Sequence, residues 1–560
     1  MIIKGSELPE GGRIEADVAI VGGGPAGITL ALELADSGLQ VLLMEGGGGR
    51  TSPRADSFTG EVADGTRHPP LTLYRHRGLG GASALWGGRC VPFAPVDFEV
   101  RPHIPWSGWP IGATEFAPWY ARAGAWCESG PSRFRVAEAL GPDAPPAVTG
   151  LTDPDIESDG LERFSRPTHF GRRYRRMLAA APRLRVVVGA MCVGVDTMAS
   201  GRAVEALRFA VRPGHLFTVR ARAYVLAAGG LETTRLLLAS GIGGEWVGRF
   251  YMCHLEGKAA WARFRPGTSV IFAYERDGGG VYLRRHFALS PDAQRRLRTT
   301  NVILRIEPPA IADPSHVNPV LSALWLSRTF LKPEYARKLA SFGYRGALPV
   351  GASALVLRHL ANVTGNLPEL ARFSADWLLR HTLARRKLPY VATAATNGAF
   401  SLDYNAEQVP NPESRVTLTD KRDVFGVPRL HVNWQVTPQD TESIVAAHRA
   451  LASALARSGT GRLEFDEDAI RGGYNAIGGH HIGTARMADD PSAGVVDRDC
   501  RVFTVENLWL AGSAVFPTSS HANPTLTIVA LAARLAAHLA AQLGGHGQTG
   551  RADTLPQAAE

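Results

Sequence analysis

The sequence predicts a mixed α/β protein, in which a parallel sheet of the Rossmann type is combined with an inserted α+β domain built on an antiparallel sheet and helices. Three observations support this fold class. Residues 17–45 have the pattern of a strand, a glycine turn, a helix and a second strand. Between about 256 and 465 the pattern changes to short alternating segments, which are typical of antiparallel strands. The last hundred residues return to the first pattern, with a strand at 508–511 and an Ala/Leu helix from Pro524, so the second domain is expected as an insertion.

The composition is that of a globular protein with more than one structural unit. The chain has 560 residues, of which 45% are hydrophobic and 20% charged, and a net charge of +9. Its basic residues are scattered and lack interleaved aromatic residues, so nucleic acid is not an expected partner. The five cysteines lie far apart, which indicates neither a disulfide framework nor a metal site. No signal peptide and no apolar stretch of membrane-spanning length is apparent, and the expected location is the cytoplasm, with no transmembrane segment.

A glycine motif of the form G-x-G-x-x-G follows the first strand and opens the first helix. Gly22 allows the tight turn, Gly24 lets the backbone approach a pyrophosphate, and Gly27 lets the helix pack closely on the strand. The positive end of the helix dipole then faces the phosphates. Glu45, at the end of the second strand, is placed to accept hydrogen bonds from ribose hydroxyls. The unit predicts a dinucleotide site and by itself does not separate FAD from NAD.

Two further glycine-rich turns favour FAD. Residues 77–88, with the sequence RGLGGASALWGG, are a loop of small side chains around Trp86. Such a loop suits the close approach of a flat ring and a diphosphate. Residues 227–230 form a second glycine turn, which follows another strand and opens another helix.

Two segments interrupt the regular pattern. Residues 100–165 are rich in Pro, Trp and turn residues and are expected to form a loop-rich excursion. Residues 320–390 are unusually apolar at helical spacing and are expected to be core helices, with a lid, a dimer face or a membrane-surface patch as alternatives. The predicted division is a first domain of 1–100, 166–255 and 466–545, a second domain of 101–165 and 256–465, and a flexible tail of 546–560.

Five segments, spread over nearly the whole chain, resemble the glucose-methanol-choline (GMC) oxidoreductase family. They are VGGGPAG, RGLGGASALWGG, AAGGLETTRLLL, GGHHIGTARM and AGSAVFPTSSHANPTLTIVALAARLA. The HANPTLT ending and the SGWP segment near residue 107 are similar to the branch containing pyranose 2-oxidase, bacterial glycoside 3-oxidases and the flavin subunit of fructose dehydrogenase. The resemblance implies a Rossmann-like FAD-binding domain, an inserted substrate domain, and an oxidase or dehydrogenase acting on CH–OH groups.

The resemblance also implies the catalytic residues. The catalytic histidine of the family lies in a His-x-x-Gly-Thr segment, which His480, Gly483 and Thr484 match, and its second His or Asn is matched by Asn523. His481 is a secondary candidate. A neutral imidazole suits removal of the hydroxyl proton, and an amide can stabilise the oxygen as it gains alkoxide character. Proton abstraction at His480 and hydride transfer to flavin N5 are therefore expected.

The expected mode of flavin binding is non-covalent. In pyranose 2-oxidase a histidine of the glycine loop is bonded to the flavin, whereas the matching residue here is Leu85, which cannot form that bond. The residues that the motifs and the resemblance place against the cofactor are Gly22, Gly24, Pro25, Ala26, Gly27, Glu45, Arg77, Gly80, Gly81, Ser83, Trp86, Gly87, Cys192, Ala228, Gly229, Gly512, Pro524 and Thr525.

The substrate is less defined than the reaction. A sugar, a glycoside or a secondary hydroxyl of a larger metabolite is expected, with oxygen or another electron acceptor. Lyases and decarboxylases also use this fold, and an apolar tunnel built by residues 320–390 would favour a hydrophobic substrate. A redox-silent FAD-binding protein is a third alternative, against which the intact pair of His480 and Asn523 argues.

Overall fold

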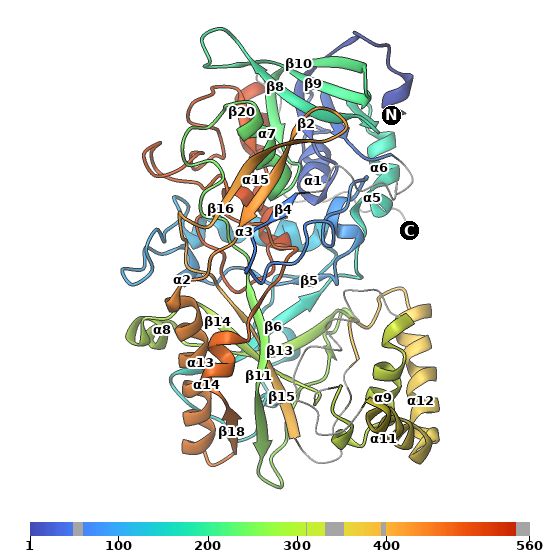
Figure 1. Ribbon diagram of the computed structural model, residues 1–560, viewed down its shortest axis with the longest axis vertical. Coiled ribbons are helices and arrows are strands. Elements are labelled where there is room, and N and C mark those ends of the chain that lie inside the picture. Colours follow the sequence, from blue (N-terminus) through green and yellow to red (C-terminus); the bar gives the residue numbers. More distant parts are fainter. Residues whose placement is uncertain (49–59, 310, 331–351, 392, 394–398, 545–560) are drawn as a thin grey trace.

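The computed structural model describes residues 1–48, 60–309, 311–330, 352–391, 393 and 399–544, in two lobes that each contain a large sheet (Figure 1). Both chain ends of the described part belong to the first lobe. The predicted tail at 546–560 lies outside the described residues. The mixed α/β class with a Rossmann-like lobe and a second lobe is confirmed.

The first lobe is built on an eight-stranded sheet. Its parallel part carries the strand–helix–strand unit predicted from residues 17–45, and two antiparallel strands extend one side. The order is β1 (Ile2–Lys4), β7 (Leu184–Val188), β3 (Val41–Glu45), β2 (Arg13–Val21), β10 (His215–Leu226), β9 (Val204–Arg212) and β8 (Met191–Thr197), and β20 (Leu508–Leu510) also pairs with β10.

Close packing at the end of β2 requires glycine. Helix α1 (Pro25–Glu33) begins directly after the strand, with Pro25 at its first position and Gly24 as the N-cap residue. A Cβ atom on Gly27 would lie 1.9 Å from the carbonyl oxygen of Gly22, so no side chain fits there. Gly22 itself has a φ of +109°, which glycine adopts without strain. The motif therefore has the conformation that the sequence predicts.

The second lobe is built on a nine-stranded sheet that is antiparallel throughout. Figure 1 shows helix α13 (Pro438–Arg457) on one side of this sheet. On the other side it shows α9 (Pro319–Leu326), α11 (Ala352–Gly365) and α12 (Leu367–Trp377). The order is β18 (Gly461–Phe465), β11 (Leu255–Phe264), β15 (Ala399–Ala406), β14 (Val302–Glu307), β13 (Tyr282–Leu289), β6 (Ile156–Phe164) and β5 (Arg89–Cys90), with β12 (Glu275–Arg276) on β13 and β19 (Asn475–Ala476) on β11.

Alternation along β14 and β15 gives this sheet two different faces. Leu304, Ile306 and Leu402 belong to the apolar core that includes α13. Arg305 and Asp403 alternate with them and therefore project from the opposite face. One face of the sheet is thus an ordinary core, and the other is charged although it is buried.

A small third sheet and further helices complete the fold. A third sheet consists of β16 (Arg415–Arg422), β17 (Pro428–Asn433) and β4 (Glu61–Val62). The remaining α-helices are α2 (Pro95–Phe98), α3 (Ala113–Trp126), α4 (Val136–Leu140), α5 (Phe170–Arg173), α6 (Arg175–Ala180), α7 (Gly230–Ala239), α8 (Pro291–Leu297), α9 (Pro319–Leu326), α11 (Ala352–Gly365), α12 (Leu367–Trp377), α14 (Glu467–Gly472) and α15 (Thr525–Leu543). Short 3-10 or π segments are Gly5–Glu7, Gly81–Ala84, Pro314–His316, Arg328–Phe330, Leu378–Leu383 and Ser513–Val515.

The expectation of a loop-rich excursion at residues 100–165 is wrong for much of that segment. Helix α3 spans four turns and contacts α15 of the first lobe, while β6 joins the second sheet. The Tyr120 and Thr527 hydroxyls share a hydrogen bond of 3.0 Å across the helix contact. Tertiary packing outweighs the turn-forming composition here, including Pro118 inside the helix. The predicted domain boundaries stay a prediction.

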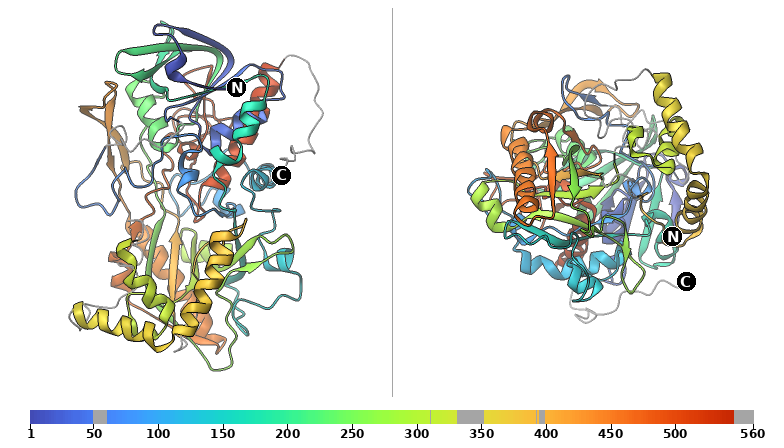
Figure 2. Two further views of the ribbon diagram at one scale, coloured as in Figure 1. Left: turned by 90° about the vertical axis from the view of Figure 1, so that its right-hand side faces the viewer. Right: turned by 90° about the horizontal axis from the view of Figure 1, so that it is seen from below.

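The apolar segment around residues 320–390 is helical where it is described, but it is only partly core. In α9 and α11, Trp325 stacks on His359 with ring centroids 4.1 Å apart. Helix α12 has no buried residue, and after it Leu379 is 62% and Leu383 67% exposed. Figure 2 shows these helices on the outside of the second lobe. The amphipathic pattern predicts a helix, but it does not indicate whether the apolar face of that helix is covered. Residues 331–351 and 394–398 lie outside the described part.

One helix in the described part, α15, is long and apolar enough to cross a membrane. The expectation that no apolar stretch reaches this length is therefore wrong by length and composition. Within the fold, 56% of its apolar window is buried, and the helix packs on α1 and α3. Such burial is typical of a core helix in a large α/β protein, which passes the same length and composition test.

Candidate active site

A cavity of about 540 Å³ lies between the two lobes. Its lining comes from the carboxyl ends of β2, β3 and β10, from the glycine loop before β5, from the N-terminus of α15 and from the charged face of the second sheet. In open α/β sheets, ligands bind at the carboxyl ends of the strands, and this volume is in the usual range for ligand pockets.

Most of the residues predicted to contact a cofactor or substrate line this one cavity. The exceptions are Gly27, which packs α1 on β2, and Gly80, whose backbone N–H donates to the carbonyl of Gly23 at 2.7 Å. Those that line it are Gly22, Gly24, Pro25, Ala26, Glu45, Arg77, Gly81, Ser83, Trp86, Gly87, Cys192, Ala228, Gly229, His480, His481, Gly512, Asn523, Pro524 and Thr525.

Glu45 is held in place by the backbone around the glycine turn. Its carboxylate accepts hydrogen bonds from the N–H of Gly23 at 2.8 Å and of Gly47 at 2.6 Å. Burial raises the pKa of this carboxyl group, and the two backbone donors partly offset the effect. Each carboxylate oxygen has a second lone pair, so Glu45 can still accept hydrogen bonds from ribose hydroxyls.

The second glycine loop is fixed at both ends of its short 3-10 turn. The Ser83 hydroxyl donates to the carbonyl of Gly80 at 2.6 Å and accepts from the backbone N–H of Phe170 at 3.0 Å. The indole N–H of Trp86 donates to the carbonyl of Thr168 at 3.0 Å, and its ring packs edge-on against Phe170. Leu85, between these anchors, is 40% exposed and lines the cavity.

His480 and Asn523, which lie far apart in the sequence, meet at the cavity. Asn523 Nδ2 lies 3.2 Å from His480 Nε2, and the other ring nitrogen, His480 Nδ1, lies 2.6 Å from Nδ1 of the fully buried His254. Asn523 Oδ1 is buried without a partner among the described residues, which marks it as an acceptor for a bound molecule. The pair can therefore take a proton from a ligand and hydrogen-bond the same ligand.

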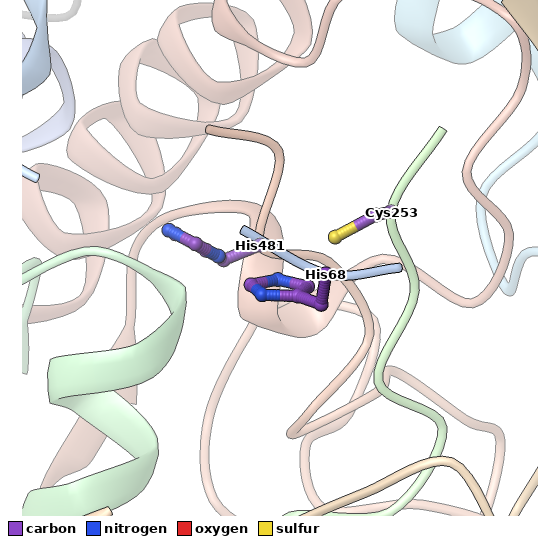
Figure 3. A group of neighbouring side chains, drawn as sticks. All are labelled: His68, Cys253 and His481. Atoms are coloured by element: carbon purple, nitrogen blue, oxygen red, sulfur yellow. The ribbon is translucent and has the colours of Figure 1, made fainter. Parts of the chain in front are cut away.

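His481 belongs to a separate cluster with His68 and Cys253 (Figure 3). The Tyr251 hydroxyl is hydrogen-bonded to all three side chains. The hydroxyl lies 2.8 Å from His68 Nε2, 2.9 Å from His481 Nδ1 and 3.3 Å from Cys253 Sγ. One ligand atom each of His68, Cys253 and His481 lies close enough to the other two for the three to bind a metal ion. However, one hydroxyl has one proton and two lone pairs, so Tyr251 can donate to His68 and accept from the other two. This hydrogen bonding accounts for the cluster.

The charged face of the second sheet forms the other wall of the cavity. Arg305 donates from Nη1 to Glu162 at 2.9 Å and from Nε to Asp403 at 2.7 Å. Burial by itself would raise the pKa of Glu162, but the neighbouring guanidinium groups of Arg89 and Arg305 lower it to about 2. Lining side chains from this face are Arg89, Glu162, Glu256, Lys258, Arg284, Arg305, Glu307, Asp403 and Asn405.

Some polar atoms of this wall have no hydrogen-bond partner among the described residues. Glu162 Oε2 and Asn405 Nδ2 are two of them, and both residues are fully buried. Buried polar groups without a protein partner usually bind a ligand or an ordered water. The motifs and the family resemblance did not indicate this wall. The signal in the sequence was the placement of Arg305, Asp403 and Asn405 at every second position of otherwise apolar strands.

The glycine-lined half of the cavity fits FAD. Gly24, at the N-terminus of α1, leaves space on the cavity side, because a Cβ atom there would meet no protein atom closer than Gly81 Cα at 4.0 Å. The helix N-terminus, the carboxylate of Glu45 and the loop around Trp86 supply the groups that a pyrophosphate, a ribose and a flat ring require. Fold and site together define a flavin-dependent oxidoreductase.

Comparison with known proteins leads to the family. Residues 410–532 match the family described as GMC oxidoreductase, and residues 15–79 match an FAD binding domain. The 6'''-hydroxyparomomycin C oxidase of Streptomyces lividus is 23% identical over 95% of this chain and 93% of its own length. The paromamine 6'-oxidase of Streptomyces fradiae is 24% identical over 94% and 92%. The C-glycoside 3-oxidase of Arthrobacter globiformis is 32% identical, over 23% of this chain and 25% of its own.

Solved structures share the fold over nearly the whole chain. Formate oxidase is similar with a TM-score of 0.54 at 17% identity, covering 96% of this chain and 99% of its own. Pyridoxine 4-oxidase from Mesorbium loti is similar with a TM-score of 0.50 at 19% identity, covering 93% and 98%. The chain thus contains a segment that matches the GMC oxidoreductases and a segment that matches an FAD binding domain; it binds FAD and oxidises CH–OH groups.

Proposed function

We propose that this enzyme oxidises a hydroxyl group of a polar, polyhydroxylated substrate such as a sugar, an amino sugar or a glycoside, with His480 as the general base. The observation that carries the proposal is the position of the His480–Asn523 pair and the charged wall around Arg305 on the same cavity. The His480–Asn523 pair supplies the chemistry, and the charged wall indicates the substrate class.

His480 and Asn523 have complementary roles at the hydroxyl group. The Nε2 atom of His480 accepts the hydroxyl proton, since a neutral imidazole is a suitable base near neutral pH. The amide of Asn523 donates a hydrogen bond to the oxygen as negative charge develops on it, and it needs no proton transfer to do so. FAD, when bound, supplies the hydride acceptor.

The charged wall favours a polar substrate over a fatty one. Residues 320–390 contribute little to the cavity lining, chiefly Leu321 and Tyr390, so no apolar tunnel is built from that segment in the described part. A hydrophobic substrate would leave Glu162 Oε2 and Asn405 Nδ2 without partners, at a cost of about 1–3 kcal/mol each. Sugar hydroxyls can donate to the first and accept from the second. Two relatives of nearly full length are named as oxidases of 6'''-hydroxyparomomycin C and of paromamine, which supports the same class.

A substrate panel tests this proposal. Anaerobic mixing with sugars, amino sugars and glycosides should reduce the bound flavin, seen as loss of its absorbance, whereas long-chain and aromatic alcohols should not. In the Asn405→Ala variant, KM for the sugar should rise about tenfold with unchanged flavin content, because one buried hydrogen bond to the substrate is lost. Asn433→Ala on β17, which does not line the cavity, is the matched control. Reduction by fatty alcohols alone would contradict the substrate class.

The flavin should be bound without a covalent bond. Leu85, at the loop position that carries the flavin bond in pyranose 2-oxidase, has no nucleophilic atom. Acid precipitation of the purified protein should therefore release all flavin into the supernatant, measured by absorbance. A yellow pellet would contradict this prediction and would direct attention to the histidines near the glycine loop, His76 and His169. Oxygen as the electron acceptor and a cytoplasmic location stay predictions.

A further inference from the structure

Behind the His480–Asn523 pair lies a second buried histidine, His254. It directly precedes β11, is fully buried, and is not among the residues that line the cavity. Its ring stands nearly perpendicular to that of His480, at 86°, with centroids 4.8 Å apart. A group in this position cannot touch the substrate, but it can determine the orientation and the tautomer of the His480 ring.

The hydrogen bonds around His254 determine where its proton lies. His254 Nε2 is 3.0 Å from the backbone carbonyl oxygen of Ser519, which can only accept. His254 Nε2 therefore carries a proton and donates. Burial lowers the pKa of His254 to about 4, so the ring is neutral at physiological pH and its Nδ1 atom is a bare acceptor.

The protonation of His254 in turn determines that of His480. The 2.6 Å contact between the two Nδ1 atoms needs one proton, and because His254 Nδ1 is bare, His480 Nδ1 must supply it. A neutral His480 then has a bare Nε2 atom, which is the atom beside Asn523. This is the tautomer that a general base at the cavity requires.

Backbone hydrogen bonds hold the segments that carry the two histidine rings. Ile477 donates its N–H to the carbonyl of His254 at 2.9 Å, and its own carbonyl accepts the N–H of His480 at 2.9 Å. The Ser519 hydroxyl accepts from the backbone N–H of Gln408 at 3.1 Å, which fixes the turn that carries the Ser519 carbonyl. Because the rings are already fixed, they lose little rotational freedom when the substrate binds.

We infer that His254 is a positioning residue, which holds His480 in the tautomer with a proton on Nδ1 and a bare Nε2 toward the substrate hydroxyl. This inference rests on the proposed role of His480 as the base. When the hydroxyl proton arrives at Nε2, the proton on Nδ1 stays on His480, because the buried His254 is too weak a base to remove it. His254 thus orients the base and stabilises it by one hydrogen bond, without entering the proton transfer.

Two isosteric substitutions separate the two nitrogens of His254. Asparagine places its amide oxygen near the position of Nδ1 and keeps the acceptor toward His480, whereas glutamine places its amide nitrogen near Nε2 and keeps only the donor toward Ser519. His254→Gln should slow anaerobic flavin reduction about 100-fold, with unchanged half-saturation by substrate and unchanged FAD content. His254→Asn should stay within about tenfold of the wild-type rate.

The outcomes distinguish this inference from the proposed function. Equal rates for the two variants, with a large loss in His480→Ala, would overturn the role of His254 and leave His480 as the base. An unimpaired His480→Ala would overturn the proposed function itself. If the His254 variants do not fold, NMR of the 15N-histidine-labelled wild-type holoenzyme tests the same inference. The signal of His480 is assigned as the one that is missing from the spectrum of His480→Ala. It should show the proton on Nδ1, and a proton on Nε2 would overturn the inference.

Discussion

Replacing His480 with alanine should slow reduction of the flavin by substrate about 1000-fold, while FAD binding stays intact. General-base catalysis typically contributes 10²- to 10⁴-fold, and the structure places this imidazole on the substrate cavity beside Asn523. The measurement is stopped-flow flavin absorbance under anaerobic conditions, with the FAD content and melting temperature determined on the same preparation.

His431→Ala is the matched control for this experiment. His431 lies on β17 in the third sheet and does not line the cavity, so its loss should leave the reduction rate within about twofold of wild type. A His480→Ala variant that reduces its flavin at the wild-type rate would show that another group takes the proton, and His481 would then be the first to test.

Gly24→Ala should weaken FAD binding by about 10- to 100-fold without unfolding the protein. The nearest protein atom that the added methyl group would meet is Gly81 Cα, at 4.0 Å, and alanine readily adopts the φ of −82°. The apoprotein should therefore tolerate the substitution. On the cavity side, however, the methyl group occupies the space through which the N-terminus of α1 approaches the pyrophosphate. Titration of the apoprotein with FAD, followed by flavin fluorescence, measures the change in Kd.

Gly112→Ala separates the cofactor effect from a general effect of the substitution. Gly112 is also a helix N-cap, with a φ of −78° and no described protein atom within 4 Å of the place that an added methyl group would take, but it lies before α3 and away from the cavity. FAD affinity should be unchanged in this variant. Wild-type affinity in Gly24→Ala would mean that the pyrophosphate does not lie at the N-terminus of α1.

The dinucleotide unit could be predicted from the sequence because its determinants are local. The turn at Gly22, the close contact at Gly27 and the carboxylate at Glu45 all lie within one strand–helix–strand segment, where spacing along the chain determines spacing in the fold. The family motif around His480 and the Asn523-Pro524-Thr525 turn likewise indicated two groups that the fold brings to 3.2 Å.

The contacts that refine the site could not be predicted in this way. His254 and His480 are separated by 226 positions, and nothing in either segment shows that two ring nitrogens lie 2.6 Å apart. The same holds for the Tyr251 hydroxyl, whose partners His68 and His481 come from two distant segments. Hydrogen bonds between distant segments depend on how the two lobes pack, which is a property of the whole core.

Local pattern therefore determined the Rossmann-like lobe and its glycine turns, because backbone geometry and glycine sterics act over a few residues. The predicted pair of His480 and Asn523 came from the family resemblance. Tertiary structure alone decided which face of the second sheet is the charged cavity wall, and whether the apolar helices after Pro319 are covered. The physical reason is that alternation and amphipathicity define two faces of an element, whereas only packing against other elements decides which face is buried and what it meets.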